Sequence, residues 1–261
     1  MDKVTIIIPL HKFEEDEKKY LPRAVESIND LEGIENVSVI AVGPKDVLDA
    51  AKETLDTCKA TLTSLENDET DFASQVNKAV YSVVDPYFMV LEFDDILNKF
   101  ALKNLEEYKR DEGDTAVYLT ISEMRNTNGD FMSFINEIAW SASFADNIGY
   151  IDEDALKSYA DFNVTGAFIK TETFLEVGKL KPSFGIAAWY EFLLREAHND
   201  NIIYVIPKIG YVHTSGREDS YFNTFAKEHD AAYISWLVKH APEEAKYTEE
   251  RELSYDEKKK V

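Results

Sequence analysis

The sequence is poor in cysteine, glycine and proline, and it has no long apolar run. Among its 261 residues there is a single cysteine, Cys58. An internal disulfide is therefore excluded, and we expect a reducing, cytoplasmic setting. Ten glycines and seven prolines leave no low-complexity stretch. No segment approaches the roughly 18 apolar residues of a transmembrane helix, and the first apolar segment is too short for a signal peptide. We therefore expect no membrane span.

Basic residues are also scarce. The chain has 28 lysines and arginines against 50 acidic residues, which gives a formal net charge of −22. Such a charge opposes non-specific binding to nucleic acids and to anionic membranes. It leaves room for a protein that recruits divalent cations. The hydrophobic content of 44% and the aromatic content of 12% are enough for a large core.

Short apolar runs alternate with helical periodicities over residues 1–110. We expect strands at 4–10, 37–42, 60–65 and 88–91, and helices at 21–31, 46–58, 72–84 and 97–108. A charged loop is expected at 11–19. This alternation predicts a parallel sheet that carries helices on both faces.

The pattern is less regular in the second half of the chain. Strands are expected at 116–124, 167–169 and 202–206, and helices at 171–177, 190–198 and 222–240. Residues 126–147 are rich in aromatics and turn formers and show no clear period. The composition shows no linker, so we expect one domain over 1–242 in two halves, 1–110 and 111–242. The highly charged residues 243–261 are expected to form a solvated helix or a frayed tail.

Three carboxylates stand directly after the apolar run at 88–91. They are Glu92, Asp94 and Asp95. Carboxylates this close repel one another unless a positive charge lies among them, and Mg²⁺ or Mn²⁺ suits such oxygen ligands. Ligands of open α/β sheets bind beyond the carboxyl ends of the strands, where this motif is expected. The alternative is that Asp94 or Asp95 simply caps a helix over 96–108.

A series of short segments appears in a specific order along the chain. They lie at 4–9, 21–28, 72–79, 91–95, 165–169, 174–178, 190–195 and 211–215. In this order they resemble the family 2 glycosyltransferases. The resemblance implies an α/β fold of the GT-A type, which is Rossmann-like, with a mixed, mostly parallel sheet and helices on both faces. Residues 1–110 would form the nucleotide-binding half and 111–242 the acceptor half.

The resemblance also implies a metal-dependent reaction. A sugar would move from a nucleotide-diphosphate sugar to an acceptor, which we expect to be a saccharide, a lipid-linked sugar or a protein. A nucleic acid acceptor is disfavoured by the charge of −22. Mn²⁺ or Mg²⁺ would stabilise the negative charge that develops on the leaving diphosphate.

By the same resemblance, individual residues take roles in the site. The donor would contact Pro9, Asn77, Glu92 and Asp94; the metal would contact Asp94, Asp95 and His213; the acceptor would contact Gly166 and Trp189. Glu92 would face the ribose hydroxyls. Two alternatives stay open, because His213 also reads as a structural histidine after a strand and Trp189 as a core residue.

The chain departs from the family at the catalytic acid pair. An inverting transferase needs a general base for the acceptor hydroxyl, but the two positions read Ala188 and Trp189, which cannot accept a proton. Glu191 is the candidate base two residues further on. The alternative is a surface ion pair, because Glu191 and Arg195 are four residues apart on a predicted helix.

Two other functions compete with a transferase. One is a non-catalytic protein that binds nucleotide-sugars or glycans on the same fold, which the missing acid pair favours. The other is a sugar nucleotidyltransferase, which ranks last because the segment His11-Lys12-Phe13 after the first strand contains no glycine.

Overall fold

The computed structural model describes residues 2–112, 115–144 and 147–255. Nine strands form one mixed sheet in the order β3-β2-β1-β4-β8-β6-β9-β5, with β7 paired to β6. The strands are β1 Val4–Pro9, β2 Val37–Gly43, β3 Thr61–Glu66, β4 Tyr87–Val90, β5 Ile96–Leu97, β6 Val117–Asn126, β7 Phe131–Ile135, β8 Phe168–Lys170 and β9 Ile203–Ser215.

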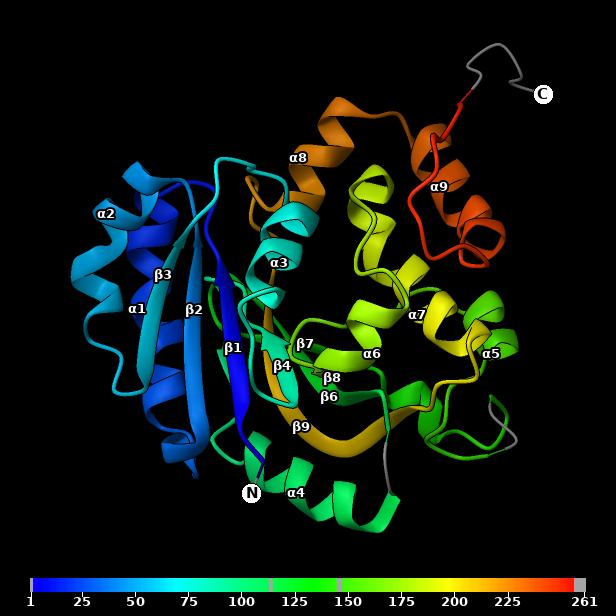
Figure 1. Ribbon diagram of the computed structural model, residues 1–261, viewed down its shortest axis with the longest axis horizontal. Coiled ribbons are helices and arrows are strands. Elements are labelled where there is room, and N and C mark those ends of the chain that lie inside the picture. The colour runs from blue at the N-terminus through cyan, green and yellow to red at the C-terminus, as the bar shows by residue number, and fades with distance from the viewer. Residues whose placement is uncertain (1, 113–114, 145–146, 256–261) are drawn as a thin grey trace.

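Helices cover both faces of this sheet (Figure 1). The α-helices are α1 Glu15–Asn29, α2 Lys45–Leu55, α3 Phe72–Val80, α4 Ala101–Glu112, α5 Glu153–Ser158, α6 Thr171–Glu176, α7 Ala188–His198, α8 Tyr221–Glu228 and α9 Ala231–Glu244. Three short 3-10 helices lie at Ile34–Asn36, Glu137–Trp140 and Pro182–Ala187. Within the described ranges, no helix combines the length and the apolar character that crossing a bilayer requires.

The sheet is mostly parallel, as the sequence predicts. Strands β1, β2, β3, β4, β6 and β9 run in one direction, whereas β5, β7 and β8 run in the other. Strand β1 pairs in parallel with β2 on one side and with β4 on the other, so the carboxyl ends of these three strands lie at the same edge of the sheet. In sheets of this kind that edge is the usual place for a ligand.

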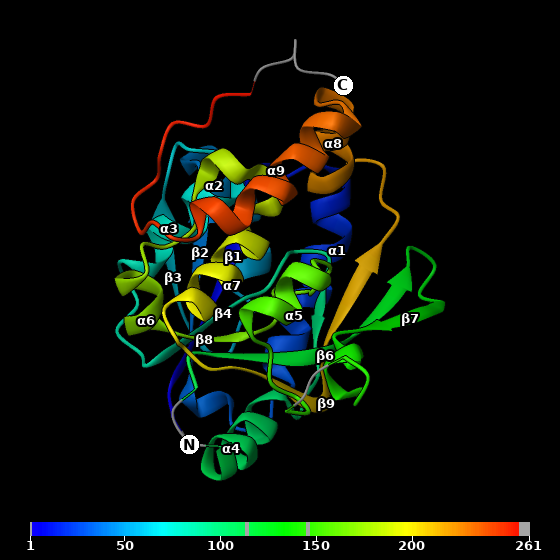
Figure 2. The ribbon, with the colours of Figure 1, turned by 90° about the vertical axis from the view of Figure 1, so that its right-hand side faces the viewer.

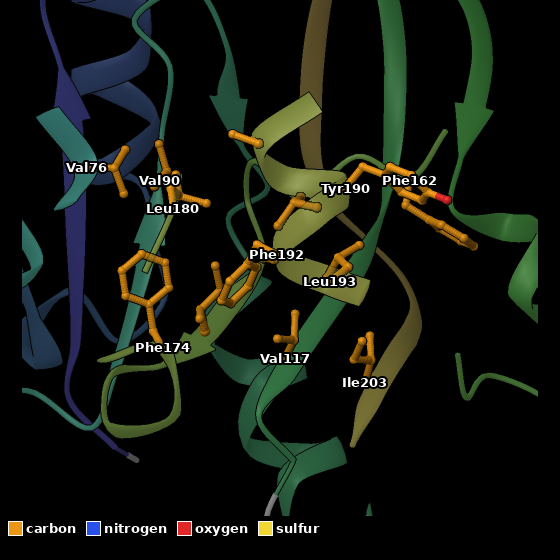
Figure 3. Close-up of a cluster of buried hydrophobic side chains, with 14 of the residues drawn as sticks. Val76, Val90, Val117, Phe162, Phe174, Leu180, Tyr190, Phe192, Leu193 and Ile203 are labelled. Atoms are coloured by element: carbon orange, nitrogen blue, oxygen red, sulfur yellow. The ribbon is translucent and has the colours of Figure 1, made fainter. Parts of the chain in front are cut away.

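The core consists of two apolar layers, one on each face of the sheet. Successive residues of a strand point to opposite faces, and β1 follows this rule, since Ile6 and Ile8 belong to one layer and Ile7 to the other. Helices α1, α2 and α4 cover the first layer, and α3, α6, α7 and α9 cover the second. Figure 3 shows the second layer, where Phe174 and Phe192 lie near Val90 and Val117 of the sheet.

Two helices begin at positions that differ from the prediction. Helix α1 starts at Glu15 inside the expected charged loop, because Glu14 and Glu17 form a capping box in which the Glu14 amide donates to Glu17 Oε2 at 2.9 Å. After the acidic motif, β5 comes first and α4 starts only at Ala101. Asn98 precedes α4, and its carbonyl and side-chain oxygens accept hydrogen bonds from the amides of Ala101 and Phe100. The interpretation of Asp94 or Asp95 as the cap of this helix is therefore wrong.

Three further segments also differ. The region without a clear period contains β7, which forms a hairpin with β6, and this hairpin projects from the body of the molecule in Figure 2. The expected helix over 222–240 is divided into α8 and α9, because Asp230 caps a new helix by accepting a hydrogen bond from the Tyr233 amide at 2.8 Å. Part of the expected tail packs on the domain, since the ring of Tyr255 lies 5.1 Å from that of Tyr233; residues 256–261 lie outside the described residues.

A buried acid in α7 makes stability depend on pH. Glu196 is fully buried, and its Oε2 accepts a hydrogen bond from Asn201 Nδ2 at 2.6 Å. Burial raises the pKa of Glu196 from 4.5 to about 7. Between these two pH values the folded protein keeps a proton that the unfolded chain has lost, so this group lowers stability as pH rises through the window and continues to do so above it.

We predict that Glu196→Gln stabilises the protein at pH 8 but not at pH 4.5. The gain at pH 8 should be about 1–3 kcal/mol, because one pKa unit corresponds to about 1.4 kcal/mol. Urea unfolding at the two pH values measures it. Glu172→Gln is the control, because the Glu172 side chain is 70% exposed. Equal effects of Glu196→Gln at both pH values would contradict the prediction.

Candidate functional site

The acidic motif lies at the carboxyl end of β4, in the middle of the sheet. The Leu91 amide donates to the Ile7 carbonyl at 2.9 Å, so the chain still follows β1 when it enters the motif. Strand β5 then pairs with β9, which places Ile96 opposite Val212. This pairing brings the end of β9 against the carboxylates. The motif itself lies beyond the carboxyl end of a central strand, as the sequence predicts.

Asp95 joins the motif to β9. Its side chain is fully buried; Oδ1 accepts a hydrogen bond from the Thr214 amide at 2.6 Å, and Oδ2 lies 3.1 Å from His213 Nδ1. The Thr214 hydroxyl in turn donates to the Asp94 carbonyl at 2.6 Å. Both oxygens of Asp95 are therefore engaged, and this carboxylate orients the imidazole of His213 so that Nε2 remains for another partner.

Asp94 is paired with an arginine from the loop after β9. Asp94 Oδ2 accepts a hydrogen bond from Arg217 Nε at 2.7 Å, and both side chains are nearly buried. Arg217 also donates from NH1 to Asp219 Oδ1 at 3.0 Å and to Asp16 Oδ2 at 3.2 Å. Its guanidinium carbon lies 4.5 Å from the centre of the Phe93 ring. Arg217 thus supplies a positive charge that the carboxylates require.

The crowding of the carboxylates shifts their pKa values. Burial and the charges of Asp95 and Asp94 raise the pKa of Glu92 to about 8. Burial and Asp95 raise the pKa of Asp94 to about 6, although Arg217 acts in the opposite direction. Burial disfavours a charged His213, but the carboxylates of Asp95, Glu92 and Asp94 outweigh it and raise its pKa to about 9. The protonation of each acid at this site therefore depends on the charges of its neighbours, including Arg217 and His213.

Pro9 and Gly166 lie close to the end of β4. Pro9 is the last residue of β1 and is buried. The Gly166 amide donates to the Val90 carbonyl at 2.9 Å. Gly166 has a φ of +79°, and a Cβ atom there would lie 2.2 Å from the ring of Tyr211. Since Tyr211 OH accepts from the Glu92 amide at 3.2 Å, glycine at this position keeps Tyr211 beside the motif.

Asn77 is bonded to a neighbouring backbone segment, and Trp189 lies among aromatic rings. The Asn77 amide group bonds both ways to the backbone of Leu180, at 2.8 and 3.0 Å. Trp189 is partly buried, and its ring lies 6.0 Å from that of Phe72 and 5.7 Å from that of Phe192. Phe72 also stacks on Tyr221 at 6.2 Å. Trp189, one of the two positions expected from the resemblance to carry an acid, thus belongs to an aromatic cluster.

Glu191 lies in a buried ion-pair cluster, separate from the acidic motif. Arg195 NH2 lies 2.7 Å from Glu191 Oε2, and Lys181 Nζ lies 2.9 Å from Oε1. Lys181 also donates to the carbonyl groups of Glu244 and Tyr247 at 2.8 and 2.7 Å. The ion pair with Arg195 is confirmed, but its expected place on the surface is wrong, because the carboxylate is fully buried. This cluster fastens the end of α9 to α7.

The comparisons with known proteins give a structural likeness and no sequence match. No protein-family model matches the chain, and no curated protein matches it. The fold is similar to that of S. aureus TarS in complex with UDP-GlcNAc, with a TM-score of 0.65 and 16% identity over 92% of this chain. This chain spans 66% of the TarS chain in that structure and 42% of the chain in another TarS structure.

The fold is also similar to that of a mannosyltransferase. PcManGT from Pyrobaculum calidifontis, in complex with GDP-Man and Mn²⁺, matches with a TM-score of 0.60 and 14% identity, over 94% of this chain and 70% of that one. The chain has a GT-A-like glycosyltransferase fold. This finding confirms the fold expected from the segments at 4–215, whereas the roles of individual residues stay predictions at such low identity.

Two side-chain atoms at this site are candidate ligands for a divalent cation. Asp94 Oδ1 and His213 Nε2 are the two candidates, because Asp95 already engages His213 Nδ1 and Arg217 engages the other oxygen of Asp94. The described residues contain no group of three or more His, Cys, Asp and Glu side chains arranged to hold a metal. A site with one or two protein ligands suits Mg²⁺ or Mn²⁺ when substrate phosphates complete the coordination.

We predict that Glu191→Gln destabilises the whole domain. Removing one partner of a buried ion pair leaves uncompensated charge and costs about 3–5 kcal/mol. Urea unfolding measures the loss. Glu153→Gln is the matched control, since Glu153 likewise pairs with a basic residue four positions on, Lys157, but in a half-exposed position; that loss should stay below about 1 kcal/mol. Similar losses in the two variants would argue against the structural role of Glu191.

Proposed function

We propose that this chain is a metal-dependent glycosyltransferase that binds a nucleotide-diphosphate sugar at the acidic motif. The observation that carries the proposal is the contact of His213 Nδ1 with Asp95 Oδ2 at 3.1 Å, which holds the imidazole at the carboxyl end of β4, where Asp94 is the neighbour of Asp95 in the chain. A histidine held by a carboxylate in this way is typical of metal ligands. Mn²⁺ or Mg²⁺ would be held by Asp94 and by His213 Nε2, from which metal binding would release the proton because a histidine ligand is neutral, and the metal would supply Lewis-acid stabilisation of the diphosphate.

The other donor-site residues take roles around that centre. Glu92 stands at the start of the motif and keeps some exposure, which suits a contact with the ribose hydroxyls. Pro9 ends the strand beside it and would border the nucleotide. Asn77 would act by holding Leu180 in place, because its amide is bonded to that backbone. Asp95 is assigned to orientation of His213 more than to direct ligation.

The structural neighbours support this donor class. Crystal structures of TarS contain UDP-GlcNAc or UDP, and the structure of PcManGT is of a complex with GDP-Man and Mn²⁺. We propose a uridine or guanosine diphosphate sugar as the donor on that basis. The acceptor would enter on the side of Gly166 and Trp189, where aromatic rings suit the apolar face of a saccharide or of a lipid-linked sugar.

A non-catalytic binding protein is the second candidate. An inverting transfer needs a carboxylate within reach of the acceptor hydroxyl. Ala188 and Trp189 occupy the usual positions, and Glu191 is enclosed by Lys181 and Arg195. We infer that Glu191 is structural. A transferase with this site would act through another base or with retention of configuration, whereas a binding protein would need neither.

We predict that UDP or GDP binds to the protein and that the affinity depends on Mn²⁺. Isothermal titration calorimetry with Mn²⁺ and again with excess EDTA measures it. Asp94→Asn should reduce the affinity with Mn²⁺ about tenfold or more, since a metal ligand is lost. Asp49→Asn, which removes the same charge from an exposed position on α2, should leave it unchanged. Equal affinity with Mn²⁺ and EDTA for both nucleotides would contradict the proposal.

The two candidate functions differ in turnover. A transferase should release UDP or GDP from UDP-GlcNAc or GDP-Man, by transfer or by slow hydrolysis, and Asp94→Asn should abolish this release. A binding protein should bind the same donors and release nothing. Nucleotide release measured by chromatography, beside the binding constants, separates the two cases.

A further inference from the structure

The loop that follows β9 carries an arginine into the acidic motif. Gly216 has a φ of +87° and turns the chain, and Arg217 then reaches inward between Asp94 and the rings of Phe93 and Tyr20. Only 5% of the Arg217 side chain is exposed. A guanidinium this deeply buried needs carboxylates as partners, and the contact of Nε with Asp94 Oδ2 at 2.7 Å is the shortest of its ion pairs.

This contact places the arginine on the carboxylate that is proposed to hold the metal. A divalent cation on Asp94 would lie a few ångströms from the guanidinium, and charges of the same sign at that distance repel strongly in a buried site. The Arg217 guanidinium already forms an ion pair with Asp94 through Oδ2. Binding of Arg217 and binding of a metal at Asp94 therefore oppose each other.

Arg217 has two carboxylate partners besides Asp94. Its NH1 is held by Asp16 and Asp219, whose side chains are 40% and 36% exposed, so these partners lie nearer the solvent. Lys12 fastens Asp219 from the other side, at 2.7 Å. The guanidinium can thus release Asp94 from Nε while NH1 stays bound. The released donors suit a diphosphate, which arginine binds with two parallel hydrogen bonds.

We propose that Arg217 is an internal cation that occupies Asp94 until a nucleotide diphosphate arrives, and that it then exchanges Asp94 for the diphosphate and admits the divalent metal. The diphosphate part rests on the function proposed above; the competition for Asp94 does not. The exchange makes nucleotide and metal binding cooperative, because each removes the contact that opposes the other.

Mn²⁺ alone tests the competition. Electron paramagnetic resonance reports free Mn²⁺ during a titration at about 0.15 M salt, which screens diffuse binding to the acidic surface. Arg217→Gln should bind Mn²⁺ at least about tenfold more tightly than the unmodified protein, within the usual range of such couplings. Lys12→Gln removes the same charge nearby without contacting Asp94 and is the matched control; it should change the affinity less than about threefold.

The double variant Arg217→Gln/Asp94→Asn should lose the whole gain. The competition is overturned if Arg217→Gln binds Mn²⁺ no more tightly than Lys12→Gln, or if the gain persists in the double variant. The Mn²⁺ titration uses no nucleotide. If the protein binds neither UDP nor GDP, the proposed function is refuted, but the titration still measures the competition between Arg217 and Mn²⁺ for Asp94.

UDP and GDP test the exchange. In the unmodified protein, a saturating nucleotide should increase the Mn²⁺ affinity about tenfold or more, whereas in Arg217→Gln the increase should largely vanish. An equal increase in both proteins overturns the exchange.

A second measurement needs no substitution, in case the variants do not fold. The Nε–H signal of Arg217 in ¹⁵N-arginine-labelled protein should be protected from solvent exchange, and it should shift when UDP and Mn²⁺ are both added. A signal that stays unchanged in the saturated complex overturns the exchange as well.

Discussion

The site depends on the balance of charge at the carboxyl end of β4. Three carboxylates within four residues are stable there only because Arg217 and His213 lie among them. Each cation is bound to a different carboxylate, Arg217 to Asp94 and His213 to Asp95. Under the proposed function, an anionic diphosphate and a divalent cation would replace these internal contacts without leaving unpaired charge.

The architecture of the sheet makes this balance possible. His213 lies near the end of β9 and Arg217 in the loop that follows it; β9 is the longest strand and reaches the motif by pairing with β5. Gly166 leaves room for Tyr211, whose hydroxyl accepts a hydrogen bond from the Glu92 amide. The buried cluster of Glu191, Lys181 and Arg195 joins α7 to the end of α9. Buried charge thus has a structural role in this cluster and, under the proposed function, a chemical role at the motif.

The sequence predicted the parallel half of the sheet well, because strands such as β1 bury both faces and show as continuous apolar runs. It also predicted the place of Glu92, Asp94 and Asp95, since a motif after a central strand lies at the carboxyl edge. It did not identify Arg217 as the partner of Asp94, which is 123 residues away along the chain. It placed Glu191 on the surface, because helical spacing shows a pair but not its burial. Local patterns determine elements, whereas long-range pairing is determined only by the fold.

A crystal structure of the protein with UDP and Mn²⁺ would decide between these contacts, because the anomalous signal locates the metal without reference to the protein contacts. We expect a manganese peak between Asp94 and His213, bound to the diphosphate, with Arg217 withdrawn from Asp94 and in contact with the phosphate oxygens. A nucleotide bound at the end of β4 with Arg217 still paired to Asp94 and no manganese at that carboxylate would contradict this expectation.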